Sequence, residues 1–142
     1  MKNRKFRCCN YKVNKSGSYR NIGNLSVRVQ NGSSNEPIAF AEVNIYNLTT
    51  RGLYGENGDA NLIVRHVTDE NGEVPLIELP VLDRTDSSRS QYYATVRHFR
   101  YHPVILLNLQ IYPNITTEYN VLLTPLTLRH PDFEFIITPE LL

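Results

Sequence analysis

The stretch HVTDENGEVPLIELP, His66 to Pro80, decides the fold, because a polar Asp-Glu-Asn-Gly segment separates two apolar runs. Asp is favoured at the first position of a type I turn, and Gly supplies the left-handed residue that follows it. Residues 69–72 are therefore expected to form a hairpin turn with a glycine bulge. A calcium loop needs further alternating oxygen ligands and a distant Glu, and Asp69, Asn71 and Glu73 supply only part of that pattern.

Apolar and polar residues alternate on both sides of this turn, which is the period of half-buried β-strands. Leu25, Val27 and Val29, for example, are separated by polar residues. Pro75 cannot donate a ladder hydrogen bond, so its strand is expected at a sheet edge or with this residue facing outward. Strands are predicted at residues 24–30, 38–48, 61–67, 73–79, 91–99, 103–112 and 118–126. Seven short strands without a sustained helical period predict an all-β fold, a seven-stranded antiparallel β-sandwich.

The composition is that of a single globular domain. The chain has 142 residues, 41% of them hydrophobic and 20% charged, and this length is enough to bury a sizeable core. The formal net charge of +1 argues against a general role on nucleic acid or on a membrane surface. We divide the chain into a flexible basic N-terminal arm (1–22), the β-sandwich (23–126) and a C-terminal extension (127–142). The extension includes a short strand at 133–137 that is expected to dock on a sheet edge, in the same chain or between chains.

The basic arm lacks the apolar core of a secretory signal peptide, and no window of the chain has the apolar length of a membrane-spanning helix. It is expected to act as a solubilising tail rather than as a ligand for a polyanion. Cys8 and Cys9 are adjacent in this arm and form no Cys-x-x-Cys motif, so two free thiols are expected, and their role stays open.

No motif in the sequence indicates catalysis. His98 and His102 are four residues apart, which on a strand and corner separates them by roughly 13 Å rather than pairing them on a metal. His66 and His130 stand alone, the serines lack a nucleophile elbow, and the carboxylates form no recognisable acid and base pair. We therefore expect no catalytic residues, no metal site and no cofactor, and we interpret the protein as a non-enzyme.

Charged loops are the best candidates for a binding site. If consecutive strands run antiparallel, the loops at 49–60, 80–90 and 113–117 share one end of the sandwich, where rigid scaffolds commonly build binding surfaces. The candidate ligand-binding residues are Arg51, Tyr54, Glu56, Asp59, Arg84, Asp86 and Arg89. Asp83 also lies in these loops, and calcium held by Asp59, Asp83 and Asp86 is a further possibility on oxygen-ligand grounds, beside the simple alternative of solvated loops.

The same residues also resemble a family, the carboxypeptidase regulatory-like domains with a transthyretin-type β-sandwich. The similarity covers about residues 23–126. It lies in the second strand (Glu36, Pro37, Ile38, Ala41, Val43), the turn (Thr68, Asp69, Gly72) and a later strand and corner (Tyr93, Thr95, Val96, Tyr101, Pro103, Val104). This resemblance implies a Greek-key sandwich, and it says little about function, because such modules are appended to many proteins.

A narrower resemblance concerns residues 103–126, which are similar to the non-catalytic N-terminal region of clostridial spore cortex-lytic enzymes. It implies a module that restrains, chaperones or positions a peptidoglycan hydrolase in spore or cell-wall machinery. The location implied is the mother-cell cytoplasm or the spore. The expected partner is thus a protein, with a homo-oligomer through a sheet edge also possible. Two alternatives stay open: a carbohydrate- or peptidoglycan-binding module using loops 49–60 and 80–90, and a small hydrolase with an unrecognised site.

Overall fold

The computed structural model describes residues 21–51, 57–82, 89–127 and 134–137, and its regular secondary structure there is entirely β-strand. The strands are β1 (Ile22–Asn31), β2 (Glu42–Arg51), β3 (Asn57–Val67), β4 (Ile77–Pro80), β5 (Arg89–Arg97), β6 (Val104–Leu109), β7 (Thr116–Leu123) and β8 (Glu134–Ile137). Within these ranges, no helix is long and apolar enough to span a bilayer.

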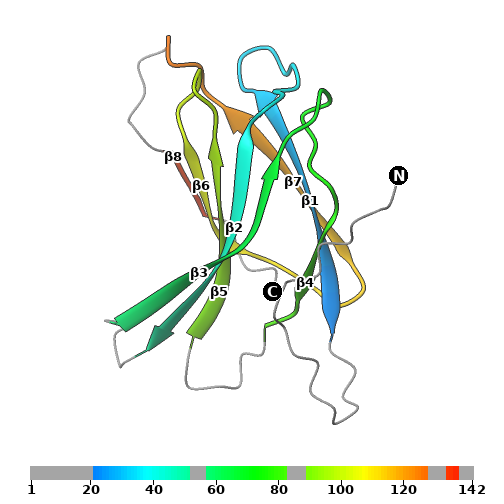
Figure 1. Cartoon of the computed structure of the whole chain (residues 1–142), viewed down its shortest axis with the longest axis vertical. Helices are drawn as coiled ribbons and strands as arrows, with labels where there is room; N and C mark the ends of the chain where they lie inside the picture. Colours follow the sequence, from blue (N-terminus) through cyan, green and yellow to red (C-terminus); the bar gives the residue numbers. More distant parts are fainter. Residues whose placement is uncertain (1–20, 52–56, 83–88, 128–133, 138–142) are drawn as a thin grey trace.

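The strands form two sheets that pack face to face (Figure 1). One sheet has the order β4-β1-β7 and the other has the order β3-β2-β5-β6-β8. Alternate residues of each sheet point into one shared core, including Val27 and Val29 of β1 and Val43 and Ile45 of β2, all at most 1% exposed. This arrangement follows from the alternation of apolar and polar residues in the sequence, because successive side chains of a strand face opposite sides of the sheet. The predicted all-β sandwich is confirmed.

Two strand pairs differ from the predicted antiparallel arrangement. β7 runs parallel to β1, with Asn24 opposite Thr116 and Asn31 opposite Leu123, and β8 runs parallel to β6. The prediction assumed that neighbours in sequence are neighbours in a sheet. Instead, the chain after β6 crosses to the other sheet and enters it at the end where β1 begins, so β7 follows the direction of β1.

The segment 49–60 is a hairpin and not the long loop that its lack of alternation predicted. Thr49 pairs with Asp59, Thr50 with Gly58 and Arg51 with Asn57, so β2 and β3 continue past the sandwich. Figure 1 shows the paired ends of β2 and β3, with the start of β5 beside β2, extending away from the three-stranded sheet. All residues described from 57 to 62 are exposed, so no core selects an apolar face there and the sequence carries no period.

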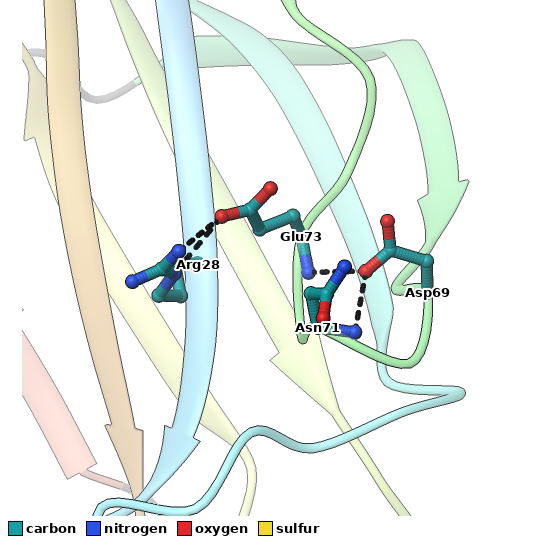
Figure 2. Close-up of polar contacts among 4 residues, drawn as sticks. All are labelled: Arg28, Asp69, Asn71 and Glu73. Atoms are coloured by element: carbon teal, nitrogen blue, oxygen red, sulfur yellow. Dashed lines mark hydrogen bonds and ion pairs between the residues drawn. The ribbon is translucent and has the colours of Figure 1, made fainter.

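A turn forms at 69–72, with Asp69 and Gly72 in the places predicted for them, although the predicted hairpin does not. The Gly72 amide donates to the Asp69 carbonyl oxygen at 3.0 Å, and Gly72 has a positive φ of 72°. The Asp69 carboxylate accepts backbone hydrogen bonds from Asn71 at 2.9 Å and from Glu73 at 3.0 Å (Figure 2). This is an Asx-type turn in which one carboxylate oxygen of the aspartate accepts two backbone amides.

The turn does not close a hairpin, because the strands on its two sides belong to different sheets. β3 ends at Val67 in the five-stranded sheet, and Glu73 bridges to Arg28 of β1 in the other one, with an ion pair between their side chains (Figure 2). The predicted strand at 73–79 is consequently reduced to this bridge and to β4. Pro75 is exposed beside β4, an edge strand, as its missing amide requires.

The predicted strand in the C-terminal extension is present as β8, which pairs with β6 from Val104–Glu134 to Leu107–Ile137. β1 already begins at Ile22, the last residue assigned to the basic arm. Residues 1–20, which include Cys8 and Cys9, lie outside the described residues.

Candidate functional site

The described strand ends that flank the three predicted connections lie at one end of the sandwich. Thr50 pairs with Arg89 at the start of β5, while Pro80 and Thr116 pair with the first residues of β1. A pocket of about 190 Å³ lies at this end, between the described residues of the 80–90 connection, the start of β5 and the segment that follows β6. It is lined by Val81, Leu82, Ser90, Gln91, Tyr92 and the segment 108–112. We call this the charged end.

Few of the predicted binding side chains can be placed at the charged end. Arg51 and Asp59 form a 3.8 Å ion pair between the Arg51 Nη2 and Asp59 Oδ2 atoms, with side chains 68% and 71% exposed. Such an exposed pair contributes at most about 1 kcal/mol. Arg89 is described through its backbone, and Tyr54, Glu56, Asp83, Arg84 and Asp86 lie outside the described residues. Their grouping as a ligand or calcium site stays a prediction.

At the opposite end, drawn at the top of Figure 1, β5 turns into β6. Large apolar side chains of the loops at this end are exposed. Phe40 is 78% exposed, Phe99 82% and Leu126 52%. We call the set Phe40, His98, Phe99, Arg100 and Leu126 the aromatic end. Single exposed apolar residues are ordinary on a protein surface, but apolar groups gathered on adjoining loops indicate an interaction site.

Phe40 has a backbone conformation that disfavours its own side chain. Its φ is 61°, whereas the other non-glycine residues with positive φ in the described chain are all asparagines, which tolerate this region. A bulky residue there costs about 1–2 kcal/mol. Strain of this kind persists only where surrounding contacts impose it, and it concentrates at functional sites.

Thr68 imposes this conformation through four hydrogen bonds to the turn at 38–41. Its hydroxyl donates to the Ile38 carbonyl oxygen at 2.6 Å and accepts from the Ala41 amide at 2.9 Å. Its backbone accepts from the Phe40 amide at 3.0 Å and donates to the Ala41 carbonyl oxygen at 2.9 Å. Thr68 is 2% exposed, so these bonds are shielded from water and hold the Phe40 ring out in solvent.

His98 joins the two aromatic loops. Its ring stacks on Phe99 with centroids 4.7 Å apart and meets the edge of Tyr101 at 5.2 Å. Its Nδ1 atom accepts the Arg100 amide at 3.2 Å, and it also forms a backbone hydrogen bond with Ala39, next to Phe40. The imidazole thus fixes both loops relative to each other, provided that Nδ1 carries no proton.

Burial, and secondarily the charge of Arg100, hold the pKa of His98 below its ordinary value of 6.5, and burial alone does the same to the pKa of His66. The folded state therefore favours neutral imidazoles. Above about pH 6.5, the full contribution of the two neutral imidazoles to the free energy of unfolding is present. This contribution is lost as the pH falls through the folded-state pKa values of His66 and His98.

We expect the urea midpoint to fall between about pH 7.5 and pH 5.5, and to fall less in a His98→Asn variant, whose amide oxygen replaces Nδ1 as an acceptor but does not titrate. The measurement is urea unfolding at both pH values. An equal fall in both proteins would contradict the role given to His98.

The other histidines and the carboxylates form no metal centre in the residues that the structure describes: no three His, Cys, Asp or Glu side chains there are close enough to hold an ion. His102 is buried at the base of the corner, where its amide donates to the Thr124 carbonyl oxygen at 2.9 Å. His130 lies outside the described ranges.

A second pocket lies beside Phe99 at the aromatic end, with a volume of about 380 Å³. It is lined by Asn31, Phe99, Arg100, Tyr101, Pro125, Leu126 and Thr127. The Tyr101–Pro125 bridge and the bond from the Leu126 amide to the Arg100 carbonyl oxygen hold its two walls together. Sequence analysis missed this site, although its signal is visible as the basic and aromatic run HFRYHP, His98 to Pro103.

Comparisons with known proteins assign no family. No family model matches the chain, and no curated protein sequence matches it. Among solved structures, a mutant of catechol 1,2-dioxygenase from Acinetobacter radioresistens is similar at 13% identity and a TM-score of 0.46, over 75% of this chain and 52% of the dioxygenase. The chain thus spans about half the length of that enzyme.

Two further structures are similar to a lower degree. The C-terminal domain of the shaft pilin SpaA from Lactobacillus rhamnosus GG has 10% identity and a TM-score of 0.39, over 73% of this chain and 98% of the pilin domain. A 9R-lipoxygenase from Cyanothece has 15% identity and a TM-score of 0.37, over 76% of this chain and 18% of the enzyme. Similarity at this level supports no assignment of activity, so the argument for function rests on the chain's own residues.

Proposed function

We propose that the chain is a non-catalytic interaction module that binds a partner protein through the aromatic end. The observation that carries the proposal is the strained and exposed Phe40, held out by Thr68 beside the equally exposed Phe99. Burying a phenylalanine side chain against a partner is worth about 1.5–3 kcal/mol. Two such rings on loops fixed by His98 are rigid anchors of the kind that dominate protein interfaces.

The partner class follows from the resemblance of residues 103–126 to the non-catalytic region of clostridial spore cortex-lytic enzymes. On that basis, the partner is a cortex-lytic peptidoglycan hydrolase that the module restrains, chaperones or positions, in the mother cell or the spore. The fold is proposed to be the carboxypeptidase regulatory-like, transthyretin-type sandwich. Residues 103–126 include β6 and Leu126, so one member of the aromatic end falls within the region of resemblance.

The alternative is a carbohydrate- or peptidoglycan-binding module that uses the charged end. The observation that favours it is a pocket at this end with polar lining residues such as Ser90, Gln91 and Gln110. A glycan binder of this type is expected to sediment with cortex peptidoglycan and to lose that binding when Arg51 is changed. A protein-binding module is expected not to sediment with cortex peptidoglycan, whether or not Arg51 is changed.

Replacement of Phe40 by glycine separates binding from folding. Glycine tolerates positive φ, so Phe40→Gly is expected to leave the free energy of unfolding unchanged or to raise it by up to about 1 kcal/mol. The same change removes an anchor ring and is expected to weaken partner binding by about 30-fold, the effect of losing a 2 kcal/mol contact. The measurements are urea unfolding and quantitative capture of the hydrolase from sporulating clostridial cells on immobilised protein.

Phe99→Ser is the second test of the aromatic end, and Arg51→Ala at the charged end is the matched control. Capture of a hydrolase that both aromatic variants lose and the control retains supports the proposal. Capture that survives both aromatic changes, or that only Arg51→Ala removes, refutes it.

A further inference from the structure

We infer that the pocket beside Phe99 takes a partner segment in which an apolar side chain stands next to a carboxylate. The apolar side chain fills the pocket, and the carboxylate pairs with Arg100. This inference rests on the proposed function and adds the chemistry of the partner to it. Two features support the inference: the apolar residues that line the pocket and the positive charge of Arg100 beside them.

The walls suit an apolar side chain. The rings of Phe99 and Tyr101 and the side chains of Pro125 and Leu126 supply four apolar surfaces, and the volume of about 380 Å³ lies within the usual range of small binding pockets. Leu126 and Phe99 are largely solvent-exposed, so covering them removes apolar area from water. A side chain placed there gains burial without first displacing a residue of the core.

Among the residues that the structure describes, Arg100 is the charged residue lining this pocket. Its guanidinium carbon lies 5.7 Å from the centroid of the Phe99 ring, which orients the group along the apolar wall. Among the described residues, the recorded ion pairs involve Arg28 with Glu73 and Arg51 with Asp59, and neither includes Arg100. An exposed guanidinium beside an apolar pocket fits a carboxylate, which it binds through two parallel hydrogen bonds.

Two acidic residues of the described chain near the turns of this end are already engaged. Glu42 accepts a hydrogen bond from the Asn44 amide at 2.6 Å, and the Asp69 carboxylate accepts two backbone amides of its turn. Arg97 lies opposite Glu42 in the neighbouring strand of the sheet. Arg100 is the arginine of the 98–101 loop that follows. Glu70 is exposed on a separate turn and does not line the pocket. Electrostatic complementarity therefore selects an acidic partner segment over a basic one.

Three synthetic peptides test the inference. They share a central leucine and differ only in the two flanking residues, which are glutamate, glutamine or lysine. Titration of the full chain, followed by amide chemical shifts in nuclear magnetic resonance, detects binding even at millimolar affinity. The acidic peptide is expected to shift the amides of Phe99, Arg100 and Leu126, and to bind about tenfold more tightly than the lysine peptide.

Charge variants locate the effect. Arg100→Gln is expected to reduce the preference for the acidic peptide to less than about twofold, and Arg100→Glu is expected to reverse it, while Arg51→Glu at the charged end leaves it intact. Equal binding of the three peptides, shifts confined to other regions, or no shifts at all would overturn the inference. Hydrolase capture that still depends on Phe40 and Phe99 in such a case keeps the proposed function standing, so the two failures are distinguishable.

Discussion

Gly72→Ala is expected to lower the free energy of unfolding by about 3 kcal/mol or more. Gly72 has a φ of 72°, where a side chain is strained. An added Cβ atom would overlap the Val29 carbonyl oxygen and lie 3.2 Å from the Ile38 amide nitrogen. Both neighbours are backbone atoms, and the Val29 and Ile38 backbones are hydrogen-bonded to each other at 3.0 Å, so neither moves cheaply.

The structural role of Gly72 explains why the effect extends beyond the turn. Its carbonyl oxygen accepts the Val29 amide at 2.7 Å, so the turn at 69–72 is attached directly to β1 in the other sheet. Strain at this residue therefore acts on the connection between the sheets. A matched control is Gly58→Ala in β3, where an added Cβ makes only ordinary contacts at 3.6 Å and the change is expected to stay within about 0.5 kcal/mol. Equal urea midpoints for the two variants would contradict this account.

Thr68→Val is expected to cost about 2–5 kcal/mol of unfolding free energy. Valine keeps the shape of threonine, but it leaves the Ile38 carbonyl oxygen and the Ala41 amide without the hydroxyl that now serves both. Each buried polar group that loses its partner costs about 1–3 kcal/mol. The control is Thr49→Val, which removes a part-buried bond to the Ser90 hydroxyl and is expected to cost less than about 1 kcal/mol.

The same substitution is expected to weaken partner binding. Without the hydroxyl, the turn at 38–41 loses two of the four bonds that keep Phe40 at positive φ, so the ring becomes free to leave its bound position. Capture of the hydrolase by Thr68→Val, measured at a temperature where the variant is folded, should fall several-fold. Undiminished capture would show that the Thr68 hydroxyl supports the fold without presenting Phe40.

The core could be predicted from the sequence, since alternation is strong wherever one face of a strand is buried. Val27, Val29, Val43 and Ile45 were recognisable as core residues for this reason, and each is at most 1% exposed. The projecting hairpin of β2 and β3 was not recognisable, because both of its faces meet solvent. The partnership of β1 with β7 was also missed, because alternation reveals which residues are buried but does not show which strands are neighbours.

The candidate site was less predictable than the core. Phe40 lies within the predicted strand 38–48 and looks like one of its outward-facing residues, and positive φ at a phenylalanine has no local sequence signal. His98 looked unpartnered because its contacts to Ala39, Phe99 and Tyr101 depend on a corner between strands. Sequence analysis favoured charged loops, where side chains are numerous, over an end where a few rings are held in place by buried hydrogen bonds.

The parallel pairing of β1 with β7 has a consequence for synthesis of the chain on the ribosome. The first strand to emerge must wait for Thr116–Leu123 before one of its two edges is covered. During that interval β1 presents unpaired amides and carbonyls together with Leu25, Val27 and Val29, a combination that promotes aggregation of nascent chains. A polypeptide that stops before β7 would keep that edge permanently open, so premature termination in this region should yield insoluble product instead of a smaller folded domain.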